Sequence, residues 1–192
     1  MKYIGPDFCN ITTLLSDEEL LIQKTANEFV AKEFLPIVNE YYEKGSFPTE
    51  LISKMGELGF FGATLPKKYG GSEISSTAYG LIMQELEKGD SGLRSVCSVQ
   101  GGLVMYPIFE YGSQEQKDKW LPKLASGQAV GCFGLTESNH GSDPSGMKTR
   151  AVRDGDDWII NGSKMWITNG SIADVAVVWA KDEDGIVRGF LL

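Results

Sequence analysis

The stretch "GCFGLTESNHGSDPSGMKTR", residues 131–150, lies where the hydrophobic pattern of the sequence changes. Before it, apolar residues recur at helical spacing. After it they form short runs rich in Val, Ile, Trp and Thr, separated by Gly, Asn or Asp. We therefore predict an α+β fold, with an N-terminal α-helical domain at residues 1–128 and an antiparallel, β-barrel-like middle domain at residues 129–192. The closing run "RGFLL" is apolar and lacks a turn, so we expect this middle domain to be truncated.

A long helix is predicted near the N-terminus by its start and stop signals. Ser16 and Glu19 have the spacing of a capping box, and an apolar stripe follows them. Pro36 is expected to kink this helix, and Gly45 is expected to close it.

Four more helices are predicted before residue 128. One runs from Pro48 to Gly59, and two more fall within residues 75–89 and 92–112. The last begins at Ser113, and we expect Pro122 to interrupt or bend it.

Five short runs predict the strands of the middle domain. Turn sequences "DGD" and "NGS" lie between some of them, which favours two consecutive hairpins. The runs are "VGCFGLTE", "KTRAVRDG", "DDWIING", "KMWITN" and "ADVAVVWA".

Composition narrows the classes of function. The net charge of −8, without a basic cluster, argues against nucleic-acid binding. The three cysteines are odd in number and lack metal-ligand spacing, which indicates reduced thiols and no metal site. No signal peptide and no apolar run of about 18 residues is found, so we expect a cytoplasmic protein without membrane insertion.

The loop after the first predicted strand has the chemistry of a phosphate site. Gly141 allows close approach of a ligand to the backbone, while Ser142 and Thr136 supply hydroxyl groups. An ordinary turn is the alternative. The sequence contains neither the P-loop pattern nor the Rossmann G-x-G-x-x-G pattern.

The run "KMWITNG" places a flat aromatic ring, Trp166, two residues before a hydroxyl group, Thr168. If this run is a strand, Trp166 and Thr168 share one face of it, which suits a planar polar ring system. The alternative is a core tryptophan beside a hydrogen-bonded threonine.

Two long stretches together resemble the acyl-CoA dehydrogenase family. "FGLTESNHGSDPSGMKTRA" and "INGSKMWITNGSIADVAVVWA" are similar to its two flavin-binding signatures, and "LPKKYGG" and "YGSQEQKDKWLPKLASG" are similar to landmarks of its helical domain. The resemblance covers nearly all of the chain after Leu15. It implies a flavoprotein oxidoreductase that binds FAD and serves fatty acid and amino acid catabolism.

The resemblance implies a set of cofactor-binding residues. Phe133, Leu135 and Thr136 would line the isoalloxazine ring of the flavin. Gly141 and Ser142 would contact the pyrophosphate. The residues from Trp166 to Thr168 would flank the ring and its N5 side. The set is Phe133, Leu135, Thr136, Gly141, Ser142, Trp166, Ile167 and Thr168.

Within the family, "GLRSVCSVQGGLVMYPI" most resembles the glutaryl-CoA dehydrogenases. By this likeness Arg94 and Ser95 face the acyl end of the substrate, and Ser142 also touches its CoA part. A guanidinium can hold a distal carboxylate through two parallel hydrogen bonds. The alternative is an Arg94 paired with a protein carboxylate such as Glu87 or Asp90.

The resemblance also implies a reaction and partners. An acyl-CoA, here glutaryl-CoA, would be oxidised at its α,β bond to crotonyl-CoA and CO₂, with electrons passing to an electron-transfer flavoprotein from a homotetramer. The family's catalytic glutamate lies in a C-terminal helical domain that would follow Leu192. We therefore assign no catalytic residue to this chain and expect it to be inactive alone.

Other functions stay open. A short-chain acyl-CoA dehydrogenase or an acyl-CoA oxidase would share these motifs, although Arg94 argues mildly against an oxidase. A non-catalytic flavin or acyl-CoA binding module is the remaining alternative. The loop departs from the family's usual "TEPNSGSD" at Ser138 and His140, and we interpret His140 as a solvent-facing loop residue.

Overall fold

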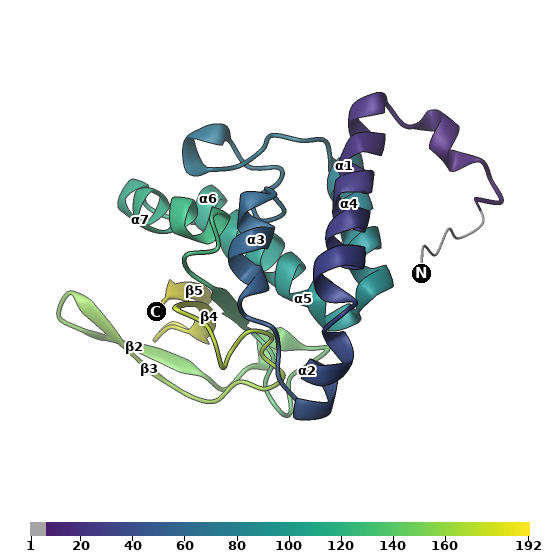
Figure 1. The fold of residues 1–192 in the computed structure, drawn as a ribbon. Helices are drawn as coiled ribbons and strands as arrows, with labels where there is room; N and C mark the ends of the chain where they lie inside the picture. The colour runs from purple at the N-terminus through teal and green to yellow at the C-terminus, as the bar shows by residue number, and fades with distance from the viewer. Residues whose placement is uncertain (1–6) are drawn as a thin grey trace.

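A computed structural model describes residues 7–192. Helices come first and strands follow, so the predicted α+β class is confirmed (Figure 1). The helices are α1 (Asp17–Phe29), α2 (Val38–Lys44), α3 (Leu51–Glu57), α4 (Ser76–Gly89), α5 (Ser91–Ser98), α6 (Tyr106–Tyr111) and α7 (Gln114–Ala125). The strands are β1 (Gly131–Gly134), β2 (Arg150–Asp154), β3 (Asp157–Asn161), β4 (Val175–Lys181) and β5 (Val187–Leu191).

The predicted helix signals are largely confirmed. Ser16 and Glu19 form a complete capping box at the start of α1, and Gly45 ends α2 in the left-handed conformation. A π-helical turn at Val30–Phe34 precedes Pro36, which therefore separates α1 from α2.

Two helix predictions differ from the structure. Pro122 does not interrupt α7, which continues to Ala125. The helix predicted at residues 92–112 divides into α5 and α6, joined by a π-helical segment, η4 (Val99–Met105). That segment widens the helix at Gly101, where the backbone of Gly62 would lie 3.6 Å from a Cβ atom.

The sheet is open and its pairing is mixed rather than wholly antiparallel. β2 pairs antiparallel with β3 around the predicted "DGD" turn, and β4 pairs antiparallel with β5. β4 runs parallel to β1, however, with Phe133 opposite Val177. About forty residues separate β1 from β4, enough chain to return β4 beside β1 in the same direction.

The predicted strand "KMWITN" and the hairpin at "NGS" are wrong. Residues 162–174 form bends and turns, and both Trp166 (φ 60°) and Asn169 (φ 67°) have left-handed backbone. The Asn169 side chain donates a hydrogen bond to Gly131 O (3.1 Å), which holds this turn beside β1. The alternation that suggested a strand therefore does not place Trp166 and Thr168 on one strand face.

One hydrophobic core joins the helices to the sheet. It includes Met55, Leu86 and Leu93 from the helices together with Val175 and Val177 from β4. α1 packs alongside α4, and the long α5–η4–α6 segment passes beside the sheet (Figure 1).

A buried glutamine connects the two halves of the molecule. Gln100 in η4 is 1% exposed; its amide donates to Leu124 O (2.9 Å) and Ala129 O (2.8 Å). Its carbonyl accepts a hydrogen bond from Gly131 N (2.8 Å), the first residue of β1. The sheet is thus positioned against the helix that carries Arg94 and Ser95.

Candidate functional site

The loop after β1 is organised around a buried carboxylate. Glu137 is 7% exposed and accepts hydrogen bonds from Lys148 N (2.6 Å), Thr149 N (3.0 Å) and Thr149 Oγ1 (2.5 Å). Lys164 Nζ adds an ion pair at 2.9 Å. Burial alone would raise the pKa of this carboxyl, but the hydrogen bonds from Thr149, Lys148 and Lys164 lower it to about 2.

The segment containing Trp166 is held against this loop. Met165 N donates to Thr136 O (2.8 Å), and Lys164 Nζ donates to Leu135 O (3.0 Å). The Trp166 side chain is left 85% exposed on a left-handed backbone. A bulky residue in that conformation is strained, and such strain clusters at functional positions.

Helix α5 meets the same segment through two hydroxyl groups. Ser95 Oγ lies 3.5 Å from Thr168 Oγ1, and both side chains are partly buried. The structure therefore brings together three segments that are far apart in the sequence, which carry Ser95, Thr136, and Trp166 with Thr168.

Gly141 and Ser142 follow a tight turn at the outer end of the loop. Glu137 N donates to His140 O (3.3 Å), and His140 N donates to Glu137 O (3.1 Å). Gly141 and Ser142 are exposed, and a Cβ at Gly141 would meet no protein atom within 4 Å. Space for a ligand thus adjoins the backbone at Gly141. His140 is half-buried rather than fully solvent-facing.

Phe133, Leu135 and Ile167 are half-buried. Phe133 packs edge-on against Trp179, with ring centroids 6.0 Å apart, and against the hydrophobic core. Of the expected ring-lining residues, Phe133 is thus the one whose contacts point into the protein.

Arg94 has protein partners. Its Nε lies 2.7 Å from Glu87 Oε2, and its Nη1 donates to Ser98 Oγ (3.1 Å). The Arg94 side chain is still 37% exposed. The alternative that Arg94 pairs with a protein carboxylate is confirmed, with Glu87 as the partner. Asp90 is not the partner, because its side chain caps the start of α5.

Several residues that organise the site were missed from the sequence. Lys164, Glu137, Asn169 and Gln100 all act through hydrogen bonds to distant backbone atoms. A charged or amide residue inside an otherwise apolar run is the only sequence signal for such a role, and it does not name the partner.

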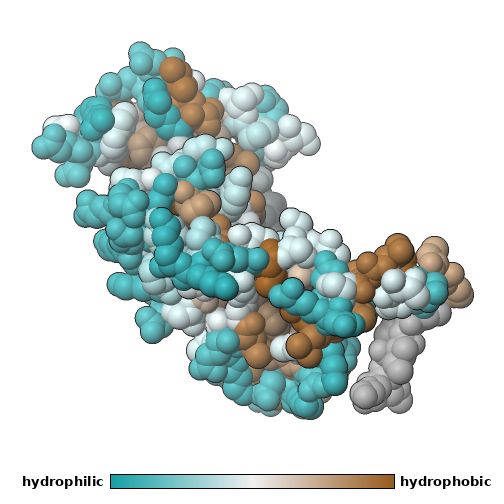
Figure 2. Space-filling model, turned by 90° about the horizontal axis from the view of Figure 1, so that it is seen from above, coloured by the Kyte–Doolittle hydropathy of each residue, from teal (hydrophilic) through white to brown (hydrophobic). Residues whose placement is uncertain are grey.

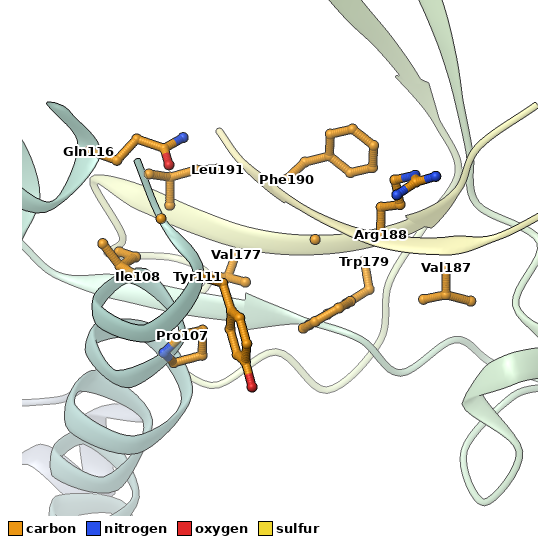
Figure 3. Close-up of a pocket in the computed structure, with 12 residues that line it drawn as sticks. Pro107, Ile108, Tyr111, Gln116, Val177, Trp179, Val187, Arg188, Phe190 and Leu191 are labelled. Atoms are coloured by element: carbon orange, nitrogen blue, oxygen red, sulfur yellow. The ribbon is translucent and has the colours of Figure 1, made fainter. Parts of the chain in front are cut away.

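A separate hollow of about 450 Å³ lies between α6 and the β4–β5 hairpin. Figure 3 shows Tyr111 from α6 and Trp179 from β4 pointing into it. Trp179 Nε1 is buried and has no hydrogen-bond partner among the described residues. The predicted flavin and acyl residues do not line this hollow, so it is distinct from the site described above.

The face seen in Figure 2 is mostly hydrophilic, and hydrophobic residues gather at its lower right, toward the N-terminal end. The exposed side chains near that end include Phe8, Ile11, Leu14 and Leu21. Within residues 7–192, the helices are too short or too polar to cross a bilayer.

Two family models match the chain. The acyl-CoA dehydrogenase N-terminal domain matches residues 16–128, and the acyl-CoA dehydrogenase middle domain matches residues 132–192.

Known proteins of this kind are similar over most of the chain. A probable acyl-CoA dehydrogenase of Bacillus subtilis is 40% identical over 89% of this chain and 46% of its own length. The human mitochondrial short-chain specific acyl-CoA dehydrogenase is 36% identical over 88% of this chain and 41% of its own.

A solved glutaryl-CoA dehydrogenase from Mycobacterium smegmatis, in complex with FADH2, is 50% identical with a TM-score of 0.94. The match covers 97% of this chain and 48% of that one. The chain thus spans less than half the length of these relatives.

Proposed function

The chain belongs to the acyl-CoA dehydrogenase family, and from that premise we propose that it forms the flavin-binding and acyl-binding part of a glutaryl-CoA dehydrogenase. The complete protein would oxidise the α,β bond of glutaryl-CoA, giving crotonyl-CoA and CO₂. Electrons would pass to an electron-transfer flavoprotein, and the enzyme would be a homotetramer.

The residues of the site fit FAD. Trp166 offers an exposed aromatic face on a strained backbone, and Gly141 leaves open space beside the main chain. Thr136, whose carbonyl accepts a hydrogen bond from Met165 N, and Thr168, two residues after Trp166, supply hydroxyl groups on the same two segments. Bound there, FAD supplies the hydride acceptor of the reaction. The neighbouring structure in complex with FADH2 supports this proposal.

The contact between Ser95 and Thr168 is the observation that supports placing substrate and cofactor in one site. Ser95 on α5 lies 3.5 Å from Thr168 of the proposed flavin segment, so the acyl-facing helix adjoins the proposed ring position. An acyl chain held along α5 would then have its reacting carbons near that ring.

Arg94 would recognise the distal carboxylate of glutaryl-CoA. Glu87 orients the guanidinium through Nε, and Ser98 engages Nη1. The guanidinium carries five N–H donors, so donors remain for a ligand carboxylate. The similarity to a glutaryl-CoA dehydrogenase supports this substrate.

We assign no proton abstraction to this chain. Glu137, the buried acid of the loop after β1, accepts hydrogen bonds on both oxygens. A carboxylate with so low a pKa is a poor general base. We propose that the base lies in the part of the relatives' length that this chain does not span.

A short-chain acyl-CoA dehydrogenase is the second candidate. Glu87 already compensates the charge of Arg94, which weakens the attraction of a substrate carboxylate. Similarity to the human short-chain enzyme favours the same alternative.

Turnover of glutaryl-CoA against butyryl-CoA by the complete protein tests the choice. With an artificial electron acceptor, we expect Arg94→Ala to lower kcat/KM for glutaryl-CoA about ten- to hundredfold, the loss expected for charge-assisted hydrogen bonds. Butyryl-CoA turnover should change little.

Arg153→Ala on β2 is the control, because Arg153 stacks on Trp158 away from α5 and should leave both substrates unaffected. Equal turnover of glutaryl-CoA and butyryl-CoA by the wild type would contradict the glutaryl-CoA assignment and favour a short-chain acyl-CoA dehydrogenase. Absence of turnover with both would contradict dehydrogenase activity.

A further inference from the structure

We propose that Lys164 is the positioning residue of the flavin site, holding the Trp166 segment and the loop after β1 in register without contacting the flavin. This inference rests on the proposed function. Its physical basis is an ion pair that joins the two proposed flavin-binding segments, which are separated by more than twenty residues in the sequence.

Lys164 makes contacts on both segments at once. Its ammonium donates to Leu135 O (3.0 Å) and pairs with Glu137 (2.9 Å), while the next amide, Met165 N, donates to Thr136 O (2.8 Å). Trp166 follows directly. The backbone that carries Trp166 is therefore held by hydrogen bonds to Leu135 and Thr136, two of the residues proposed to line the flavin.

The pair is shielded from water. The side chains of Lys164 and Glu137 are 10% and 7% exposed, so removing one partner leaves a buried charge without its counter-ion. Glu137 also binds Lys148 and Thr149, which extends the link to the start of β2. A shift of Lys164 would thus be transmitted to the whole loop, including Gly141 and Ser142.

A positioning role can be separated from a merely structural one. Lys164→Met alone should destabilise the protein. The double variant Glu137→Gln/Lys164→Met leaves no unpaired charge but keeps only one of the two acceptor oxygens of Glu137, so it should recover part of the melting temperature. If the pair only stabilises the fold, FAD affinity should recover as well. If it positions the site, FAD affinity should stay low.

The experiment titrates the complete apoprotein with FAD and records the melting temperature and the flavin absorption spectrum. We expect both Lys164→Met and the double variant to bind FAD about ten- to hundredfold more weakly than the wild type. Residual bound flavin should show an altered absorption band. In the apoprotein, hydrogen exchange at the Met165 amide should be faster in both variants.

Lys88→Met is the matched control. Lys88 pairs with Glu85, which is 2% exposed and lies in α4, so this variant also removes the partner of a buried carboxylate. It should lower the melting temperature without changing FAD affinity or exchange at Met165.

The outcomes distinguish the two proposals. Wild-type FAD affinity in the double variant would overturn the positioning role and leave the proposed function intact. Failure of the wild type itself to bind FAD would overturn the proposed function, and the positioning role with it.

Discussion

At the scale of single residues, Trp166 is the least expected feature of the molecule. An indole that is 85% exposed gains little from packing, yet its backbone is left-handed, which costs a non-glycine residue roughly 1–2 kcal/mol. Hydrogen bonds of its neighbours, at Met165 and Asn169, impose this conformation. The strain is thus maintained by the fold, as expected for a residue held in place for a ligand.

Trp166→Gly should separate stability from cofactor binding. Glycine removes the backbone strain but adds freedom to the unfolded chain, so we expect the free energy of unfolding to stay equal or rise by about 1 kcal/mol. FAD affinity should fall about tenfold, because the aromatic face is lost. Urea unfolding and FAD titration measure the two effects.

Trp166→Phe keeps both the aromatic ring and the strained backbone, and serves as the control. Loss of more than about 2 kcal/mol in Trp166→Gly would show that the indole is a structural residue.

At the scale of elements, local signals predicted the helices better than the turns. Caps such as Ser16 and Ser113 are satisfied within one helical turn, so sequence spacing alone identifies them. The run "KMWITN" alternates like a strand, but distant hydrogen bonds to Leu135, Thr136 and Gly131 fold it into turns. Such long-range partners cannot be read from a local period.

At Pro122 the sequence predicted a break or bend that the structure does not have. Helix α7 continues through this residue although proline lacks an amide donor. Proline there leaves the carbonyl of Asp118 without its helical partner. We expect Pro122→Ala to raise the free energy of unfolding by about 1 kcal/mol or more, because Pro122 is exposed and alanine restores that bond.

Chemical denaturation measures the gain at Pro122. Lys119→Ala, also exposed and one turn earlier, should change stability by less than about 0.5 kcal/mol. A loss of stability in Pro122→Ala would mean that the proline stabilises α7 through the unfolded chain.

At the scale of the whole molecule, family motifs in the sequence predicted which segments form the candidate site, but not what joins them. The motifs pointed to Ser95, Thr136, Trp166 and Thr168 individually. Their convergence depends on the placement of the sheet against α5 and η4, which buried polar groups determine. Neither composition nor periodicity specifies the partner of a buried glutamine.

Gln100 is the group on which that placement depends most. Gln100→Leu would leave Ala129 O and Gly131 N without their buried partner and remove one of the donors to Leu124 O, so we expect a loss of about 3 kcal/mol. Gln114→Leu on α7 is the control. Gln114 itself is exposed, and its amide donates to the Tyr69 hydroxyl and to Asp118, so its loss should cost less than about 1 kcal/mol.

The location of the loss can be measured, because three of the four tryptophans lie in the sheet half, at residues 158, 166 and 179. In the wild type, one core joins both halves, so tryptophan fluorescence and helical circular dichroism should report a single urea transition. In Gln100→Leu, the fluorescence transition should move to lower urea than the helical one, because the sheet loses its anchor while the helices keep their packing. Coincident transitions in the variant would mean that hydrophobic contacts alone hold the sheet to the helices, and that Gln100 does not position the candidate site.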